Sequence, residues 1–197
     1  MRQGSVSERK AMKIILIRHG TTKGNLEKRY IGATDEPLCE TGRRELLQNT
    51  YPDCDRVIVS PMKRCVETAR LIYPEKEHIL CHELRECHFG DFEGKNHNEL
   101  DGSPIYQSWI DSGGMGDFPN GERPHSFKQR SIRGFEISVS QAAHQDIIAF
   151  VIHGGNIMAI MEKYARPHRE FYEWYVKNGH GCLCDWDGEK LTLLEQI

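Results

Sequence analysis

The chain has 197 residues, of which 28% are charged and 38% hydrophobic, and its formal net charge is −3 at pH 7. This length supports one domain with a full core, and the near balance of charge argues against a disordered chain or a general nucleic-acid-binding surface. No run approaches the roughly 18 apolar residues of a membrane span, and residues 1–11 are expected to form a polar tail without the apolar core of a signal peptide.

Apolar runs of strand length alternate with helical patterns along the chain, which predicts an α/β fold with a mostly parallel sheet covered on both faces. We expect strands at residues 12–18, 56–60, 146–153, 182–187 and 191–195, and helices at 41–50, 61–73, 124–144, 155–164 and 168–175. The nearly continuous apolar content of residues 14–17 and 147–152 is typical of strands buried on both faces. Asp187-Gly188 predicts a hairpin, and with it an antiparallel edge strand.

Two local patterns shape the connections between these elements. Ser60 followed by Pro61 predicts an N-cap and a first helical residue, so that the strand at 56–60 turns directly into a helix. The periodic pattern fails between about residues 90 and 121, where glycine-rich segments frame a short helix at 105–110. We interpret residues 90–121 as a small cap inserted in a single domain that spans residues 12–197.

The cysteine pattern bears on the cellular compartment and on metal binding. Seven cysteines without a framework spacing favour reduced thiols and a cytoplasmic protein. A zinc site could be drawn from His78, Cys81 and His82, but their spacing fits no common zinc motif, and a short strand through Ile79 and Leu80 would keep the three from converging.

The candidate chemistry begins where the first buried strand ends, at Arg18-His19-Gly20. Ligands of open α/β sheets bind at this edge of the sheet. Phosphoryl transfer needs positioned positive charge on the phosphate oxygens, and arginine fits that geometry with two parallel bonds. We place Arg18 at the strand exit and Arg64 in the first turn of the next helix, whose positive end adds to the field.

His19 is the candidate nucleophile, because a neutral imidazole can attack phosphorus and carry the phosphoryl group. Neighbouring guanidinium groups favour the neutral ring, and a backbone carbonyl such as that of Gly20 would hold the second ring nitrogen. Glu86 is the candidate proton donor and later base, provided that burial raises its pKa. His153 and Asn25 are expected to bond phosphate oxygens.

Each of these residues also has an ordinary structural interpretation. A single arginine or histidine at a strand end is usually solvated or a cap, and Glu83, Glu93 and Glu99 compete with Glu86 for the role of acid. The joint occurrence of the groups at strand ends is what favours a catalytic site.

At this point the chain resembles the histidine phosphatase superfamily, also called phosphoglycerate mutase-like. The matching segments are residues 16–22 with Asn25, 30–38 with Gly42, 60–69, 83–94 and 151–155. The resemblance implies a three-layer α/β/α fold, no metal and no organic cofactor. The sequence departs from the family pattern at two positions. Thr21 stands where many members have glutamate or glutamine, and Arg123 follows Gly121-Glu122 where serine is more usual.

Carried over position by position, the resemblance implies that His19 is phosphorylated and that Glu86 is the proton donor. It implies a phosphate pocket made by Arg18, Arg64, His153 and Asn25. Thr22 and Gly154, which lie in the same matching segments, are expected among the phosphate or substrate contacts.

The cap favours a hydrolase of small phosphomonoesters over a mutase. From Lys95 to Gly121 it has one lysine or arginine against four acidic residues, which does not suit a second phosphate or a carboxylate on the substrate. Tyr106, Trp109 and Phe118 either form a pocket for a ring-containing leaving group or pack as the core of the cap.

Within the family, the short chain and two segments, residues 29–32 and 89–94, look most like phosphatases of α-ribazole 5′-phosphate in cobalamin nucleotide-loop assembly. A cofactor-dependent mutase and a binding module for a phosphorylated ligand are the alternatives. The presence of both a nucleophile and an acid argues against the binding module. The oligomeric state cannot be predicted from the sequence.

Overall fold

The computed structural model describes residues 12–141 and 147–197. The expected tail at 1–11, the last residues of the expected helix at 124–144 and Asp146 lie outside these ranges. Within the described residues, seven strands form one sheet in the order β3-β2-β4-β1-β6-β7-β5. Strands β3, β2, β4 and β1 are parallel, while β6 is antiparallel to β1 and to β7, so the antiparallel pairs lie toward one edge.

The strands agree closely with the expected ones, with two additions. They are β1 (Met12–Arg18), β2 (Arg56–Val59), β3 (His78–Leu80), β4 (Ile147–Ile152), β5 (Ala165–Arg166), β6 (Gly181–Trp186) and β7 (Leu191–Gln196). The additional strands β3 and β5 have three and two residues and lie at the two edges of the sheet, so they are too short to leave a periodic signal.

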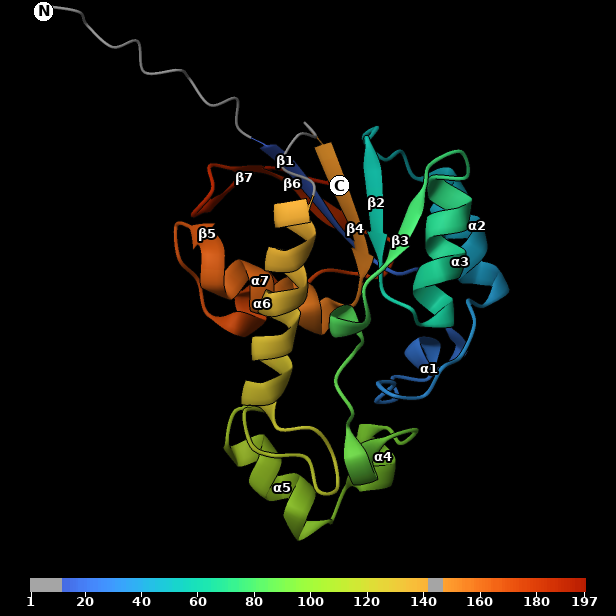
Figure 1. Cartoon of the computed structure of the whole chain (residues 1–197). Coiled ribbons are helices and arrows are strands. Elements are labelled where there is room, and N and C mark those ends of the chain that lie inside the picture. The colour runs from blue at the N-terminus through green and yellow to red at the C-terminus, as the bar shows by residue number, and fades with distance from the viewer. Residues whose placement is uncertain (1–11, 142–146) are drawn as a thin grey trace, which may run out of the picture.

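Helices cover both faces of the sheet, as Figure 1 shows. They are α1 (Lys23–Leu26), α2 (Glu40–Gln48), α3 (Lys63–Ile72), α4 (His97–Leu100), α5 (Pro104–Asp111), α6 (Pro124–Gln141) and α7 (Gly154–Tyr164), with 3-10 turns at His82–Leu84, Gly90–Phe92 and Phe171–Trp174. Helices α2 and α3 lie on one side of the sheet and α6 and α7 on the other. This is the three-layer α/β/α fold that the resemblance implied.

The alternation of side chains along the central strands separates two hydrophobic cores. Ile14 and Leu16 of β1 pack with Phe135 of α6 and Ile157 of α7, all fully buried. Ile15 and Ile17 face the other side, in a cluster that includes Cys65 of α3. Strands buried on both faces therefore account for the nearly continuous apolar runs in the sequence.

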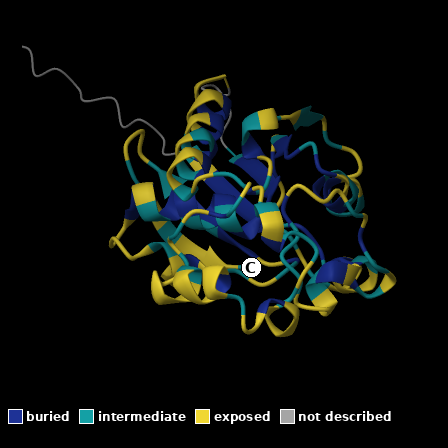
Figure 2. Cartoon of the chain, turned by 90° about the horizontal axis from the view of Figure 1, so that it is seen from below, coloured by how far each residue is buried: buried dark blue, intermediate teal, exposed yellow. Residues whose placement is uncertain are grey.

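A third cluster holds the cap, which contains α4 and α5 and projects beyond the ends of the strands (Figure 1). Its buried members are Cys87, Phe92, Leu100, Tyr106, Phe118 and Phe127. Tyr106 is therefore a core residue of the cap, which confirms the second interpretation of the aromatic residues for that side chain. Figure 2 looks at this end of the molecule and shows buried residues gathered at the centre, with exposed residues along the periphery.

Two local expectations are wrong. Helix α3 begins at Lys63 with Met62 at its N-cap and no capping side chain, because the Ser60 hydroxyl instead bonds Nε2 of His153 at 2.8 Å. The expected helix at 168–175 is a single 3-10 turn at Phe171–Trp174. Short 3-10 turns are common in connecting segments, and the sequence pattern alone does not distinguish such a turn from a longer helix.

Candidate active site

Three neighbouring strands bring the candidate residues to one edge of the sheet. The residue after β1 is His19, and its N–H donates to the carbonyl of Ile152 at the end of β4 at 2.9 Å. The N–H of Ser60, after β2, donates to Val151 of β4 at 3.1 Å. The strand ends are thus in register, and the side chains of His19, Ser60 and His153 meet where the carboxyl ends of β1, β2 and β4 converge.

The His19 ring is held in one tautomer. Its Nδ1 lies 2.7 Å from the carbonyl oxygen of Gly20, to which it donates, so in the neutral ring Nε2 carries the lone pair. This confirms the contact expected for Gly20. Only 3% of His19 is exposed, and burial, together with the charges of Arg64 and Arg18, lowers its pKa well below the ordinary value of 6.5. The ring is therefore neutral near pH 7, with the lone pair on Nε2.

Arg64 is fully buried and lies against His153. Its Nε donates to Nδ1 of His153 at 3.3 Å, and its terminal nitrogens donate to the carbonyls of Thr34 and Gly32 at 2.8 and 2.9 Å. Because Nδ1 accepts, Nε2 of His153 is the protonated nitrogen, and it donates to Ser60. Both nitrogens of His153 have protein partners. A phosphate oxygen could therefore accept a hydrogen bond from Nε2 only by displacing the Ser60 hydroxyl.

Arg18 reaches the same edge from the end of β1. Its Nη1 donates to the carbonyl of Val176 at 2.8 Å, and its guanidinium lies 5.5 Å from the centre of the Tyr175 ring. Its Nε is buried and has no hydrogen-bond partner among the residues that the structure describes. A buried unpaired donor on a cation is costly unless an anion takes it. A Cβ on Gly154 would lie 3.3 Å from this nitrogen, so Gly154 leaves room at the Arg18 side chain.

Asn25 lies in the short helix α1, and Thr22 precedes that helix. Thr22 is its N-cap: its hydroxyl accepts from the N–H of Asn25, and its own N–H donates to Oδ1 of Asn25. Oδ1 of Asn25 also accepts from Nδ2 of Asn178 at 3.1 Å, which leaves the Nδ2 donors of Asn25 for another acceptor. Thr22 is completely buried, so its position indicates that it orients Asn25.

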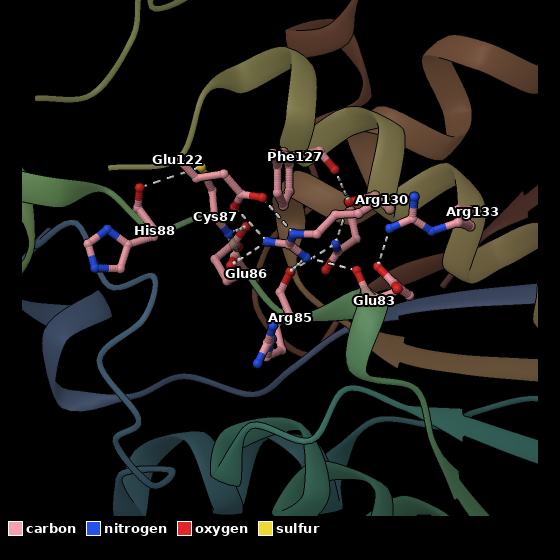
Figure 3. A network of polar contacts seen from close by, with 11 residues as sticks. Glu83, Arg85, Glu86, Cys87, His88, Glu122, Phe127, Arg130 and Arg133 are labelled. Carbon is pink, nitrogen blue, oxygen red and sulfur yellow. Dashed lines mark hydrogen bonds and ion pairs between the residues drawn. The ribbon is translucent and has the colours of Figure 1, made fainter. Parts of the chain in front are cut away.

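Glu86 lies in the chain segment between two 3-10 turns, below α6 (Figure 3). Its Oε1 accepts the N–H of Cys87 at 2.9 Å, and a Cβ on Gly155 would lie 2.6 Å from the same oxygen. Burial raises the pKa of Glu86 above 4.5, against the opposing effects of the Cys87 N–H and the charges of Arg64, Arg18 and Arg130. The direction of this shift favours the protonated acid.

The other candidate acids are engaged elsewhere. Glu83 pairs with Arg133 at 2.9 Å, Glu99 pairs with Arg29, and Glu93 accepts three backbone N–H groups of the loop at residues 32–34. Of the four glutamates considered from the sequence, the one that lies beside Arg18, Arg64 and the cavity described next is Glu86.

A cavity of about 230 Å³ opens beside these groups, under the cap. Its charged lining residues are Arg18, Glu86 and Lys128, and Gly154 also lines it. The rest of its wall is mainly aromatic, made by Tyr30, Phe89, Trp109, Phe118, Phe127, Phe171, Tyr172 and Tyr175. Trp109 and Phe118 thus line a cavity, although Phe118 is also a buried member of the cap core, and Tyr106 stacks on Trp109.

Metal ligation and membrane insertion find no support in the described part of the chain. Among residues 12–141 and 147–197, no group of three or more His, Cys, Asp and Glu side chains is placed to hold a metal ion. The zinc cluster considered from His78, Cys81 and His82 is not formed. No helix in these ranges is long and apolar enough to cross a bilayer.

Sequence reasoning missed two residues that hold the His19 loop in place. The Thr68 hydroxyl accepts the N–H of Gly20 at 3.0 Å and donates to the carbonyl of Arg64. Nδ2 of Asn178 donates to the carbonyl of His19 at 3.1 Å. Both hold backbone atoms of residues 19–20, which are 48 and 159 positions away in the sequence. Thr68 lies in the matching segment 60–69, but nothing in its residue type marks this contact, and Asn178 lies outside the matching segments.

Comparison with known proteins gives a consistent picture. A model described as the histidine phosphatase superfamily (branch 1) matches residues 14–196. The adenosylcobalamin/alpha-ribazole phosphatase of Escherichia coli K12 is 29% identical over 180 residues, with 87% of each chain covered. The protein of the same name from Salmonella typhimurium is 33% identical over 177 residues, covering 85% of this chain and 87% of the relative.

A broader phosphatase and a solved structure extend the comparison. A broad-specificity phosphatase of Saccharomyces cerevisiae is 26% identical over 189 residues, covering 89% of this chain and 80% of that protein. The crystal structure of a putative alpha-ribazole-5′-P phosphatase from Escherichia coli superposes with a TM-score of 0.83 at 27% identity, covering 93% of this chain and 95% of the other.

Proposed function

Since the chain belongs to the histidine phosphatase superfamily (branch 1), we propose that it is a phosphomonoesterase that hydrolyses a small-molecule phosphate ester through a phosphohistidine at His19. The observation that supports this most directly is the His19 ring, which is buried, neutral and fixed by Gly20 with Nε2 as the free nucleophilic nitrogen. It lies beside two arginines and a glutamate whose raised pKa favours the acid form.

In the first step, the lone pair on Nε2 of His19 forms a bond to phosphorus as the ester P–O bond breaks. The leaving oxygen takes the proton of the Glu86 carboxyl, so that an alcohol departs instead of an alkoxide. Arg18 and Arg64 carry the charge of the equatorial oxygens, and the Nδ2 donors of Asn25 add a neutral hydrogen bond. The unpartnered Nε of Arg18 is the donor most readily available to the phosphate.

In the second step, a water molecule attacks the phosphohistidine. Glu86, now a carboxylate, takes a proton from this water, the N–P bond breaks, and inorganic phosphate leaves. Glu86 is again protonated and His19 is again neutral, so the catalytic groups return to their starting state without an added cofactor.

The cavity supports an uncharged, ring-containing leaving group, and we propose α-ribazole 5′-phosphate as the substrate. Among the described residues that line the cavity, the cations are Arg18 and Lys128, and Lys128 is paired with Glu162 at 2.7 Å. The aromatic wall offers ring surfaces for stacking but no free cation for a carboxylate or a second phosphate. This favours hydrolysis over mutase-type transfer. We therefore expect a low kcat/KM with 3-phosphoglycerate.

Trapping the intermediate tests the proposal. Enzyme mixed with ³²P-labelled ester and quenched in alkali should carry a base-stable, acid-labile label, and His19→Asn should carry none and show no turnover. His125→Asn, an exposed histidine on α6, is the matched control and should behave as wild type. Turnover by His19→Asn would refute the mechanism, and absence of turnover in the wild type would point to a binding module.

The substrate is tested separately. We expect kcat/KM for α-ribazole 5′-phosphate to exceed those for glycerol phosphate and 3-phosphoglycerate in the presence of a chelator. Trp109→Ala should reduce that preference, while leaving the value for glycerol phosphate nearly unchanged. A preference for 3-phosphoglycerate would instead support the mutase alternative.

A further inference from the structure

The segment that carries Glu86 is held in an unusual way. Residues 85–89 have no regular secondary structure, so their carbonyl groups have no place in a helix or in the sheet. Buried or half-buried carbonyls need donors, which here come from side chains and from backbone N–H groups elsewhere in the chain. The conformation of Glu86 therefore depends on the groups that supply those donors.

Arg130 of α6 donates to two of these carbonyls, those of Arg85 and Glu86, and to that of Glu83 in the preceding turn, as Figure 3 shows. Nδ2 of Asn156 also donates to the carbonyl of Arg85, at 3.3 Å. One terminal nitrogen, Nη1, donates to the carbonyls of Glu83 and Arg85 at 2.8 and 2.6 Å. The other, Nη2, donates to the carbonyl of Glu86 at 2.9 Å. A single guanidinium thus fixes three carbonyls over four consecutive residues, including that of the proposed acid.

Arg130 is itself fixed from two sides. The carboxylate of Glu122 accepts its Nε and Nη2 at 2.7 Å each, in a two-point pair whose side chains are only 14% and 20% exposed. The guanidinium also lies 5.0 Å from the centre of the Phe127 ring, which lines the aromatic cavity. The backbone N–H of Glu122 donates to the carbonyl of His88 at 2.8 Å, so the pair brackets the Glu86 segment from both ends.

Resting on the phosphatase activity proposed above, we propose that Arg130, held by Glu122, is a positioning residue that fixes the carboxyl group of Glu86 for proton transfer to the leaving oxygen. Proton transfer needs the acid within hydrogen-bond reach of that oxygen. A displacement of about 1 Å can cost on the order of 100-fold in rate. Arg130 reaches Glu86 through its backbone and does not itself touch the reacting atoms.

Replacing arginine with lysine separates geometry from charge. Arg130→Lys keeps a cation near Glu86, but an ammonium group cannot reproduce a planar fork that serves three carbonyls and a carboxylate together. If positioning is the role, Arg130→Lys is impaired although the charge is retained. If only the charge matters, Arg130→Lys is nearly wild type and Arg130→Met is not.

The readout is the dependence of kcat/KM on the leaving group. This ratio reports formation of the phosphohistidine, which needs the acid for an alkyl ester but hardly for an ester with a good leaving group. We expect Arg130→Lys to lower kcat/KM for glycerol phosphate roughly 10- to 100-fold and to change that for 4-nitrophenyl phosphate far less. In a Glu86→Gln background, Arg130→Lys should cause no further loss with glycerol phosphate.

Matched variants complete the test. Arg133→Lys is the control, because Arg133 lies on the same helix, is 57% exposed and bonds only the Glu83 side chain in this segment. Glu122→Gln leaves Arg130 and its carbonyl partners in place. It should show a smaller loss of kcat/KM than Arg130→Lys, again larger for glycerol phosphate than for 4-nitrophenyl phosphate. This variant decides the question if Arg130→Lys does not fold.

Equal losses on both esters, or additive losses in the Glu86→Gln background, would overturn the role of Arg130. The proposed phosphatase activity would survive that result, since it depends on labelling of His19. Loss of the His19 label in the wild type would instead remove the activity itself.

Discussion

Thr68 shows how much of the site depends on a single buried hydroxyl. It accepts the N–H of Gly20 and donates to the carbonyl of Arg64, so it joins the loop of the proposed nucleophile to the helix that carries Arg64, a proposed phosphate ligand. Thr68 is completely buried, so no solvent can replace it. The distance between His19 and Arg64 is therefore maintained by a residue that takes no part in the chemistry.

Thr68→Val keeps the shape of the side chain and removes both hydrogen bonds. We expect it to lower the free energy of unfolding by about 1–3 kcal/mol, because the Gly20 N–H is left buried without a partner, and to lower kcat. Urea unfolding and steady-state kinetics measure the two effects. Thr68→Ser keeps the hydroxyl and should restore kcat; a Ser variant as impaired as the Val variant would show that the methyl group matters instead.

The opposite pKa shifts of His19 and Glu86 predict the pH dependence. The nucleophile must be neutral, and its lowered pKa places the rising limb of kcat/KM below pH 6.5. The acid must be protonated, and its raised pKa places the falling limb above pH 4.5. Between these limbs the two groups are in the forms that the first step needs.

Glu86→Gln should remove the falling limb for glycerol phosphate and lower its kcat/KM by about 10²- to 10⁴-fold, with a much smaller loss for 4-nitrophenyl phosphate. Profiles of kcat/KM against pH for both enzymes measure this. The ionisation of the substrate is common to both, so the difference between the curves isolates Glu86. An unchanged falling limb in Glu86→Gln would assign it to another group.

At the scale of residues, the sequence predicts the groups of the proposed site better than the residues that hold them in place. Arg18, His19 and Glu86 stand in motifs at strand ends or in family segments, and the structure brings them together. Thr68 and Asn178 could not be predicted, because their partners are backbone atoms, and a backbone carbonyl leaves no trace in the identity of its residue. Ser60 is a different case: its hydroxyl was expected to cap a helix but bonds the side chain of His153, which is 93 residues away in the sequence.

At the scale of elements, Glu93 ties the first loop of the site to the cap. Its carboxylate accepts the N–H groups of Gly32, Ala33 and Thr34, as well as that of Phe89. Burial alone would raise its pKa, but these donors outweigh burial and lower it below 4.5. The carbonyls of Gly32 and Thr34 in turn accept from Arg64, so the cap and the phosphate pocket share this loop.

Glu93→Gln replaces one acceptor oxygen with an NH2 group, which cannot accept a hydrogen bond from the N–H donors that it faces. We expect a loss of about 1–3 kcal/mol in the free energy of unfolding at pH 7. Because the folded-state pKa is lowered, the contribution is present above pH 4.5 and disappears as the pH falls through the folded-state value. Urea unfolding at a series of pH values below 7 should show a difference from wild type that shrinks as the pH falls through the folded-state pKa, while the exposed Glu75→Gln should differ little throughout.

Long elements could be predicted from their patterns and short ones could not. Strands β1 and β4 are apolar over nearly their whole length because helices cover both faces, and that run is visible in the sequence. Strands β3 and β5 pair with one neighbour each and are too short for periodicity. The expected helix at 168–175 is only a 3-10 turn at Phe171–Trp174. The aromatic residues of this segment pack against α7 or line the cavity, and one turn is enough to place them there.

At the scale of the whole molecule, two buried neutral histidines make stability depend on pH. Burial, followed by the charge of Arg64, lowers the pKa of both His19 and His153 well below 6.5. Unfolding exposes both rings, which then bind protons near pH 6.5. The unfolded state therefore binds more protons than the folded state below that pH, so stability rises with pH up to about 6.5 and falls as the solution is acidified.

We expect each of these histidines to contribute a slope of up to about 1.4 kcal/mol per pH unit below pH 6.5. Urea unfolding of wild type and of His19→Asn between pH 5 and 7 measures it, and the variant should lose about half of the two-histidine slope. His125→Asn should keep the full slope, because that residue is exposed. A wild-type stability that is flat over this range would mean that the two rings are charged in the folded protein.

The antiparallel direction of β6 has a consequence for how the enzyme is made. That strand lies directly beside β1, and the turn leading into it brings Asn178 back to the carbonyl of His19 and Val176 back to Arg18. A ribosome that has polymerised the chain as far as the end of α7 has already produced Arg18, His19, Arg64, Glu86 and His153, yet the central strand β1 still lacks β6 on one side. Turnover therefore has to wait for translation of the last fifth of the message, and a premature stop codon in that stretch would yield an inert polypeptide despite an intact set of reactive groups.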